Sequence, residues 1–372
     1  MLSASSPYQL QNYKKRIELL AISIENVTFA ENIHDFQMKR INWIDWVKAF
    51  CMTVVVFCHL PQQEDTFYLQ YLASVILSSF FFVSGYLKKK ILSQKESLKK
   101  YSYSLLIPYL IYNIIYYPYW LAKYYIEHGS ISMMDSLKPI IGTLLLQFNS
   151  DFSCELNGVT WFLPALFLMH WITDICHRHH CGKAIMLILT VISIILYGAN
   201  KYHHFAPYIT FHGFVRSIGF FFMGYLFRQK NIMTDVFFRK DLAIGLVTLA
   251  ISILLFYWHI HEERFVLHIA LFYVVNLLSI YGIIYLCRSI DSLHIRIITF
   301  ISIGTMLIFG IHRIIIGTID YGFEKFLNTS DILYSWYECT LLALFIELLS
   351  LPLILLVIHH YPILLGKKKQ NI

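Results

Sequence analysis

Charged residues are scarce in this chain. Asp, Glu, Lys and Arg make up 14% of its 372 residues, whereas a soluble domain carries about 25%. Hydrophobic residues make up 57%, and the mean hydropathy is +0.57. Because charge is costly in hydrocarbon and is therefore rare in membrane spans, this composition indicates an integral membrane protein.

Several other features are absent. Only nine prolines occur and no Ser- or Gly-rich stretch interrupts the chain, which argues against disordered linkers. The seven cysteines are scattered without a pairing framework, which argues against a disulfide scaffold. No P-loop and no His-Glu-x-x-His motif is present, so neither an ATP-driven pump nor an intramembrane zinc protease is indicated. The run Cys176–Cys181 is too compressed for a standard zinc module, and we expect no metal.

Long apolar stretches predict an all-α, polytopic transmembrane bundle of about ten helices. The apolar piece at 139–148 is too short to cross and is expected to lie on the outer face. The expected spans are 43–60, 68–87, 103–126, 159–176, 184–200, 211–227, 241–259, 265–287, 297–318 and 335–358.

The distribution of Lys and Arg predicts the orientation. With the N-terminus inside, the cytoplasmic segments hold 22 of the 30 Lys and Arg residues and the outer loops hold four. This asymmetry follows the positive-inside rule and places both termini in the cytoplasm. We therefore expect a cytoplasmic leader at 1–42, a transmembrane domain at 43–358 and a basic tail at 359–372. The same rule explains the net charge of +7, so the expected partner is the lipid bilayer and not nucleic acid.

The first span carries three polar residues, Asp45, Lys48 and His59. Lys48 and His59 are eleven residues apart, which at 100° per residue puts them on one face of a helix, about 16 Å apart along its axis. Asp45 lies at i−3 from Lys48 and is placed to pair with it. One polar stripe therefore runs along this helix.

This stripe has a functional and a structural interpretation. Histidine titrates in the right range to take the proton of an attacking hydroxyl, and a lysine nearer the cytoplasm suits an anionic donor. In the structural alternative, His59 caps the helix at the interface and Lys48 extends toward the headgroups. The residues alone leave both interpretations open.

Six short blocks stand in order along the chain, and each is weak alone. They are Asp45-x-x-Lys48 leading to Cys58-His59, FFFVSGYL at 80–87 before Lys88-Lys89-Lys90, IPYL at 107–110, TWFLPALF at 160–167, FFFMGYL at 220–226 and IGTMLIFGIH at 303–312. In this order they resemble the acyltransferase-3 family of membrane acyltransferases, and most closely the branch of fucose 4-O-acetylases and related sugar O-acetyltransferases. One departure is Lys48, where many members of the family carry arginine, which offers a planar two-pronged donor.

The resemblance implies an O-acyltransferase in a cell membrane, with a bacterial plasma membrane as the expected location. It implies a cytoplasmic acyl-CoA donor, with acetyl-CoA as the default, and no permanently bound cofactor. The acceptor is a hydroxyl of a glycan, a lipid-linked sugar or a related molecule. His59 is then the general base, and Lys48 with Asp45 contributes to the donor site.

Four further polar or aromatic residues are candidates for the site. Arg216, inside the sixth span, is expected to contact the donor or substrate, or else to form a structural ion pair. Trp161 is either a sugar-stacking platform or an interfacial tryptophan. His312 and the mid-span acid Glu347 are candidate substrate contacts, with a satisfied interior histidine and a paired acid as the structural alternatives.

A transporter or flippase for a glycan or small solute is the main alternative, since interior charges suit it as well. The chain has no inverted repeat and no paired broken helices, which disfavours that class. A receptor or structural protein would leave the interior charges without a purpose.

Overall fold

The computed structural model describes residues 40–63, 66–203, 208–230, 232, 238–328 and 332–368. Contacts divide the chain into two units, 1–42 and 43–372. Only residues 40–42 of the first unit are described, so nearly all of the expected leader lies outside the described residues. The helices below build the second unit.

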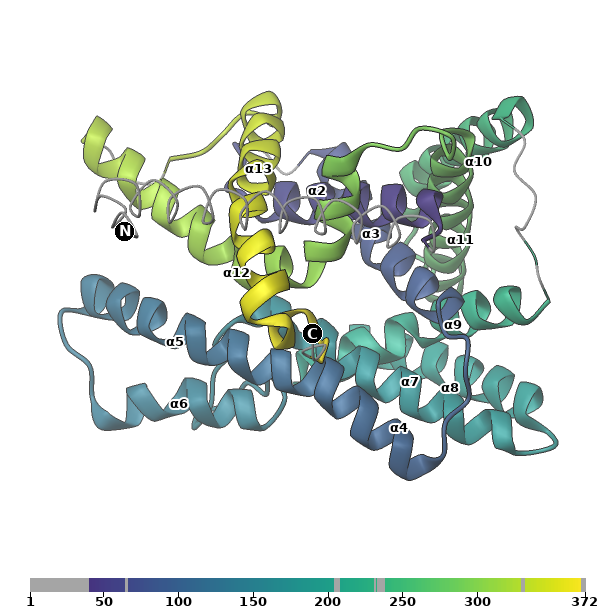
Figure 1. Cartoon of the computed structure of the whole chain (residues 1–372), viewed down its shortest axis with the longest axis horizontal. Coiled ribbons are helices and arrows are strands. Elements are labelled where there is room, and N and C mark those ends of the chain that lie inside the picture. The colour runs from purple at the N-terminus through teal and green to yellow at the C-terminus, as the bar shows by residue number, and fades with distance from the viewer. Residues whose placement is uncertain are drawn as a thin grey trace, which may run out of the picture. The chain divides into compact units, whose positions relative to one another are not determined.

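The described residues form helices and no β-strand, as the apolar pattern predicts. The α-helices are α2 (Asn42–His59), α3 (Phe67–Tyr86), α4 (Gln94–Tyr101), α5 (Ile107–His128), α6 (Met133–Leu144), α7 (Phe162–Arg178), α8 (Gly182–His203), α9 (Ile209–Gln229), α10 (Phe238–Ile260), α11 (Phe265–Ser289), α12 (Arg296–Leu327) and α13 (Trp336–His360). Figure 1 shows their arrangement.

Seven helical segments in the described part of the chain are long and apolar enough to cross a membrane. They contain α3, α7, α8, α10, α11, α12 and α13. The other three expected spans are also helical, as α2, α5 and α9. These three have lower hydropathy because α2 carries Asp45, Lys48 and His59, α5 is rich in tyrosine and α9 carries Arg216. Of these three helices, α2 lines both cavities of the candidate site described below.

Two glycines allow α3 and α9 to approach closely. A Cβ on Gly85 would lie 2.0 Å from the carbonyl oxygen of Phe221, and a Cβ on Gly224 would lie 2.0 Å from that of Phe82. The FFFVSGYL and FFFMGYL blocks therefore pack against each other, each glycine facing the backbone of the other block. Small residues serve this purpose at helix interfaces in membranes.

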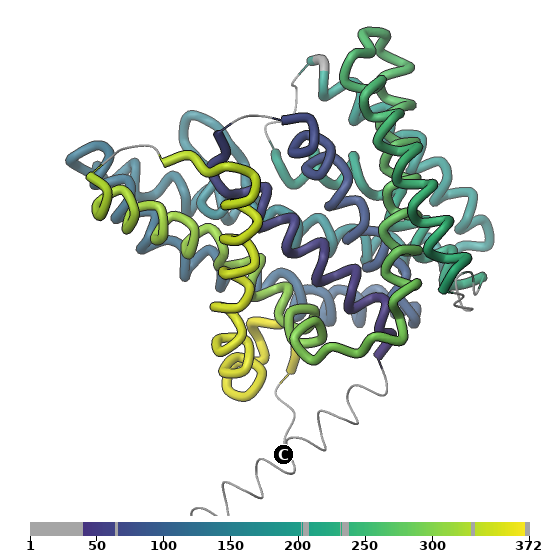
Figure 2. The backbone as a smooth tube through the Cα atoms, turned by 90° about the horizontal axis from the view of Figure 1, so that it is seen from above, coloured from purple at the N-terminus to yellow at the C-terminus, as the bar shows by residue number. Residues whose placement is uncertain are grey.

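Helix α2 is held on two sides. It begins beside the α11–α12 loop, where its Trp43 N–H donates to Asp291 at 2.7 Å. Farther along, Thr53 Oγ1 donates to Glu347 of α13 at 2.9 Å. Figure 2 shows the purple α2 crossing the view between α13 and the α10–α11 pair. These contacts fix which face of α2 turns toward α3 and α7.

Between α4 and α5 the chain makes one π-helical turn, η1 (Ser102–Leu106). The Ile107 N–H donates to the carbonyl of Ser102, five residues back. Helix α4 begins with a capping box, in which the Ser93 side chain accepts from the Glu96 N–H and Glu96 accepts from the Ser93 N–H. Such π turns are frequent at functional sites, and this one places Tyr101 and Leu105 beside a cavity that is described below.

Candidate active site

One cavity lies between the ends of α3 and α4 and the helices α2, α7 and α12, and we call it the lysine cavity. Its volume is about 540 Å³, within the range of small-molecule and cofactor sites. Deeper walls are apolar, with Leu77, Phe162 and Phe309 among them. Five lysines line it, namely Lys48, Lys88, Lys89, Lys90 and Lys100.

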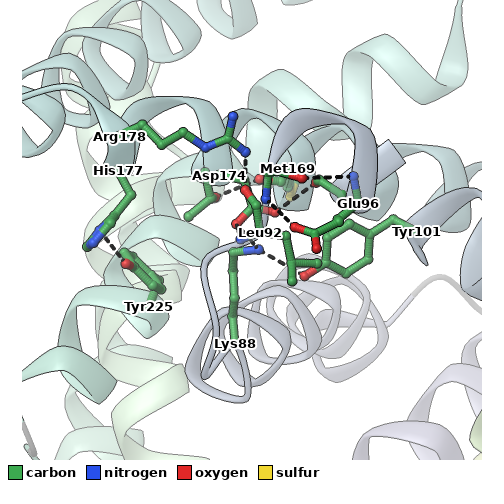
Figure 3. A network of polar contacts seen from close by, with 12 residues as sticks. Lys88, Leu92, Glu96, Tyr101, Met169, Asp174, His177, Arg178 and Tyr225 are labelled. Atoms are coloured by element: carbon green, nitrogen blue, oxygen red, sulfur yellow. Dashed lines mark hydrogen bonds and ion pairs between the residues drawn. The ribbon is translucent and has the colours of Figure 1, made fainter. Parts of the chain in front are cut away.

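A buried ion pair anchors one side of the lysine cavity (Figure 3). Lys88 Nζ lies 2.9 Å from Asp174 Oδ1 on α7, and both side chains are at most 1% exposed. Burial lowers the pKa of Lys88, and the carboxylate of Asp174 opposes that shift. Asp174 also accepts from Ser97 Oγ at 2.7 Å and from the Leu92 N–H at 3.1 Å. One carboxylate thus ties the chain after α3, and the start of α4, to α7.

Three further lysines of that segment line the cavity and stay exposed. Lys89, Lys90 and Lys100 line the cavity without being buried. Lys88 Nζ also donates to Tyr101 Oη at 2.9 Å, and the Tyr101 ring stacks on His170 at 4.3 Å between centroids. The cavity thus has a positively charged rim and an apolar interior. This arrangement suits a ligand with an anionic head group and a thin, less polar chain.

His59, at the end of α2, lines a second cavity of about 200 Å³, which we call the histidine cavity. Its Nδ1 lies 2.7 Å from the carbonyl oxygen of Val55. A carbonyl only accepts, so Nδ1 carries the hydrogen and Nε2 of the neutral ring keeps its lone pair. His59 is exposed, and this tautomer is the one a general base requires.

The ring of His312 lies against that of His59. The two rings meet edge to face with centroids 5.0 Å apart. His312 is fully buried, its Nδ1 contacts the Ile308 and Phe309 carbonyls at 3.1 and 3.0 Å, and its Nε2 has no partner among the described residues. It supports the position of His59 and does not line the histidine cavity.

Trp161 lines the same cavity as His59. It ends the 3-10 turn η2 (Gly158–Trp161) that leads into α7. A Cβ on Gly213 of α9 would lie 1.9 Å from Cζ3 of the indole, so glycine there makes room for the ring. Trp161 is half-buried and sits where an aromatic face can meet a ligand beside His59.

A buried amide and hydroxyl network holds η2 in place. Asn113 Nδ2 donates to Thr160 Oγ1 at 3.0 Å, and Gln147 Nε2 donates to the same oxygen at 3.0 Å. Asn157 Nδ2 donates to the carbonyl of Gly310, two residues before His312, at 3.0 Å. All these side chains are buried. The network therefore fixes the segments that carry Trp161 and His312.

The lysine and histidine cavities adjoin. Leu77, Phe162 and Phe309 line both of them. Lys48 lines the first cavity and His59 the second. The polar stripe expected on the first span is therefore distributed over two neighbouring cavities, with three apolar side chains where they meet.

Asp45 and Lys48 both contact Ser302 of α12. Ser302 Oγ donates to Asp45 Oδ1 at 2.6 Å, and Lys48 Nζ donates to the Ser302 carbonyl at 2.5 Å. Asp45 is buried and Lys48 is half-buried. Lys48 thus has a structural contact in addition to its place in the lysine cavity, whereas Asp45 does not line that cavity.

Arg216 and Glu347 lie elsewhere. Arg216 lines a third cavity, formed by α3, α8, α9, α10 and α11, and is absent from the lining of the lysine cavity. Glu347 is 2% exposed and accepts from Thr53 on α2. It lines none of the three cavities described here.

Three residues of the lysine cavity region were not identified from the sequence. Asp174 had a usable signal, because an acid near the end of an apolar span must be paired or functional. His170 and Tyr101 had none, since their stacking depends on how α4 docks against α7.

The fold and the cavities define a helical membrane protein with two adjoining sites, one basic and one containing an exposed histidine. Residues 41–359 match the family model described as an acyltransferase domain. The chain belongs to this acyltransferase family, and the match extends beyond the last of the six sequence blocks. With its apolar helices, it is a multi-pass membrane acyltransferase. No curated protein and no solved structure matched the chain.

Proposed function

We propose that this protein transfers an acyl group, acetyl by default, from acyl-CoA to a hydroxyl group of a glycan or related acceptor. The observation that carries the proposal is the pair of adjoining cavities. A basic cavity suited to a phosphorylated donor shares three wall residues with a cavity that presents His59 and Trp161. Donor and acceptor can therefore meet from two sides.

The lysine cavity is the proposed donor site. CoA carries phosphates at one end and a thioester at the end of a thin arm, so its phosphates belong at Lys89, Lys90 and Lys100 on the rim. Ammonium groups bind phosphate as point charges. The arm then extends into the apolar part, past Lys48, toward Phe162 and Phe309.

The chemical step is assigned to His59. Its Nε2 takes the proton of the acceptor hydroxyl as that oxygen attacks the thioester carbonyl. The tetrahedral intermediate collapses with cleavage of the C–S bond, and the CoA thiolate takes the proton from the His59 imidazolium. The ester forms and free CoA leaves, so atoms and charges balance without an acyl-enzyme.

The acceptor site is the histidine cavity. An indole face is a suitable surface for a sugar ring, and Trp161 is held rigidly by Gly213 and by the network around Thr160. The ring of His312 packs edge to face against that of His59 and supports its position.

The charge asymmetry supports the orientation. The exposed lysines stand at the end of the bundle where α3 ends and α2 begins, and the positive-inside rule assigns that end to the cytoplasm. Cytoplasmic acyl-CoA then enters the lysine cavity, and the acceptor approaches from the opposite side of a membrane that we expect to be a bacterial plasma membrane.

The test is an acyl-transfer assay on the full chain in lipid nanodiscs. Radiolabelled acetyl-CoA is incubated with a panel of neutral and acidic glycans, and labelled ester is separated from labelled acetate. We expect label in the glycan, released by mild base as acetate. Movement of a labelled glycan across proteoliposomes without any acetylation would instead assign the protein to transport.

A further inference from the structure

The third cavity is also lined by basic side chains, but it lies apart from the lysine cavity. Its volume is about 340 Å³. It lies against the first half of α3, the start of α11 and the end of α10, where it is lined by Ser74, Tyr197, Arg216, His259 and Phe272. By the chain directions this is the end opposite the lysine rim. We call it the arginine cavity.

Arg216 uses little of its hydrogen-bonding capacity within the protein. Its Nη2 donates to the Ser74 carbonyl at 2.8 Å, and its guanidinium lies over the Phe272 ring at 4.8 Å. Within the described part of the chain no carboxylate forms an ion pair with it. A guanidinium offers five N–H donors, so most of them remain for a ligand.

His259 supplies a second unused group on the same cavity. The side chain is only 7% exposed, and its Nδ1 has no partner among the described residues. The nearby acid Glu262 is already held by Arg264, with Nε and Oε1 2.8 Å apart. Lys201 and His268 contact each other, which adds further basic character at this end.

An unpaired guanidinium between membrane helices is costly. A bound anion would offset that cost, and arginine matches the two oxygens of a carboxylate or phosphate with two parallel hydrogen bonds. The chemistry of the cavity therefore favours a carboxylate or a phosphate as its ligand.

The position of the cavity suggests which molecule carries this anion. Ala73 lines both the arginine cavity and the histidine cavity, so a ligand anchored at Arg216 lies next to the site of His59. We propose that the acyl acceptor is anionic, and that Arg216 and His259 bind its carboxylate or phosphate while its hydroxyl reaches His59. This inference rests on the proposed function.

The test measures binding separately from transfer. Wild-type protein and the Arg216→Gln variant are placed in nanodiscs of phosphatidylcholine, which has no net charge. Thermal unfolding is recorded with glucuronic acid against glucose, and with N-acetylglucosamine 1-phosphate against N-acetylglucosamine. We expect an anionic sugar to raise the Tm of the wild type more than its neutral counterpart does, with the difference lost in Arg216→Gln.

The matched control is Lys325→Gln, which removes an exposed cation of α12 that lines none of the three cavities. It should behave as the wild type. Arg216→Lys keeps the charge without the two-pronged geometry, so it should bind the anion more weakly than the wild type. This variant still tests the inference if Arg216→Gln fails to fold. Transfer to the acidic sugar should fall about 10- to 100-fold in Arg216→Gln.

Two results would overturn the inference. One is an equal response of the wild type and Arg216→Gln to the anionic sugars. The other is stabilisation by phosphatidylglycerol nanodiscs that depends on Arg216 and abolishes the sugar response, which would assign the anion to a lipid headgroup. The same samples are tested with acetyl-CoA. If acetyl-CoA does not raise the Tm of the wild type, the proposed function is rejected. If acetyl-CoA raises the Tm but the anionic sugars do not, only this inference is rejected.

Discussion

The buried pair between Lys88 and Asp174 gives the sharpest stability prediction. Asp174→Asn keeps the shape of the side chain and keeps an oxygen for the Leu92 N–H. The hydrogen bond with Ser97 is kept with its direction reversed. The amide nitrogen introduced at position 174 donates to Ser97 Oγ, which can accept. The substitution therefore removes mainly the negative charge that faces Lys88.

The magnitude follows from burial. Both side chains are at most 1% exposed, and removing one partner of a buried pair costs about 3–5 kcal/mol. We expect the Tm of the purified protein to fall by roughly 4–6 °C. The exposed pair of Lys123 and Glu127, 3.6 Å apart with side chains 59% and 50% exposed, provides the control. Glu127→Gln should change little, because exposed pairs contribute about 0–1 kcal/mol.

A pH series separates charge from packing. Burial already lowers the pKa of Lys88, and loss of Asp174 should lower it further. A lysine whose folded-state pKa lies below its unfolded value destabilises the protein at low pH, and the penalty declines as pH rises toward the unfolded value. The deficit of Asp174→Asn should therefore shrink between pH 7 and pH 10, as measured by thermal unfolding. A deficit that is constant with pH, or no larger than that of Glu127→Gln, would refute the reasoning.

The other variants test the donor and acceptor sites. Lys48→Ala should raise the KM for acetyl-CoA more than that for the acceptor, and an unchanged donor KM with a lowered Tm would leave only its structural contact with Ser302. Gly213→Ala should displace the Trp161 indole, because the added Cβ would lie 1.9 Å from it, and should weaken acceptor use about 10-fold or more with donor KM unchanged. Gly322→Ala is its control, since nothing lies within 4 Å of a Cβ there; equal effects of the two would reject the role of Trp161.

The sequence predicted those features that depend on local periodicity. Helical spacing alone put Lys48 and His59 on one side of α2, and hydropathy located a helix at each of the ten expected spans, seven of which lie in segments long and apolar enough to cross a membrane. The pairing of the two phenylalanine-glycine blocks was not predicted, because contact between α3 and α9 depends on tertiary packing.

The sites formed between helices distant in sequence were harder to predict from the sequence. The run Lys88-Lys89-Lys90 was noted in the sequence, but the cavity that these lysines line requires α4 to dock on α7 through Asp174. Arg216 was expected near the donor or substrate, and nothing in its own helix indicates that it lies beside His259 of α10. Periodicity orients a side chain on one helix, whereas its neighbours are decided by packing between helices.

The most direct test of the account is the His59→Ala variant, with Cys58→Ala as its control. Both residues line the histidine cavity, but only the imidazole has the free nitrogen that the reaction needs. In nanodiscs, His59→Ala should lower the rate of acetyl transfer by about 10²- to 10⁴-fold while its Tm and its affinity for acetyl-CoA stay at wild-type values, and Cys58→Ala should retain transfer. Full transfer by His59→Ala, or an equal loss in Cys58→Ala, would contradict the assignment of His59 as the base.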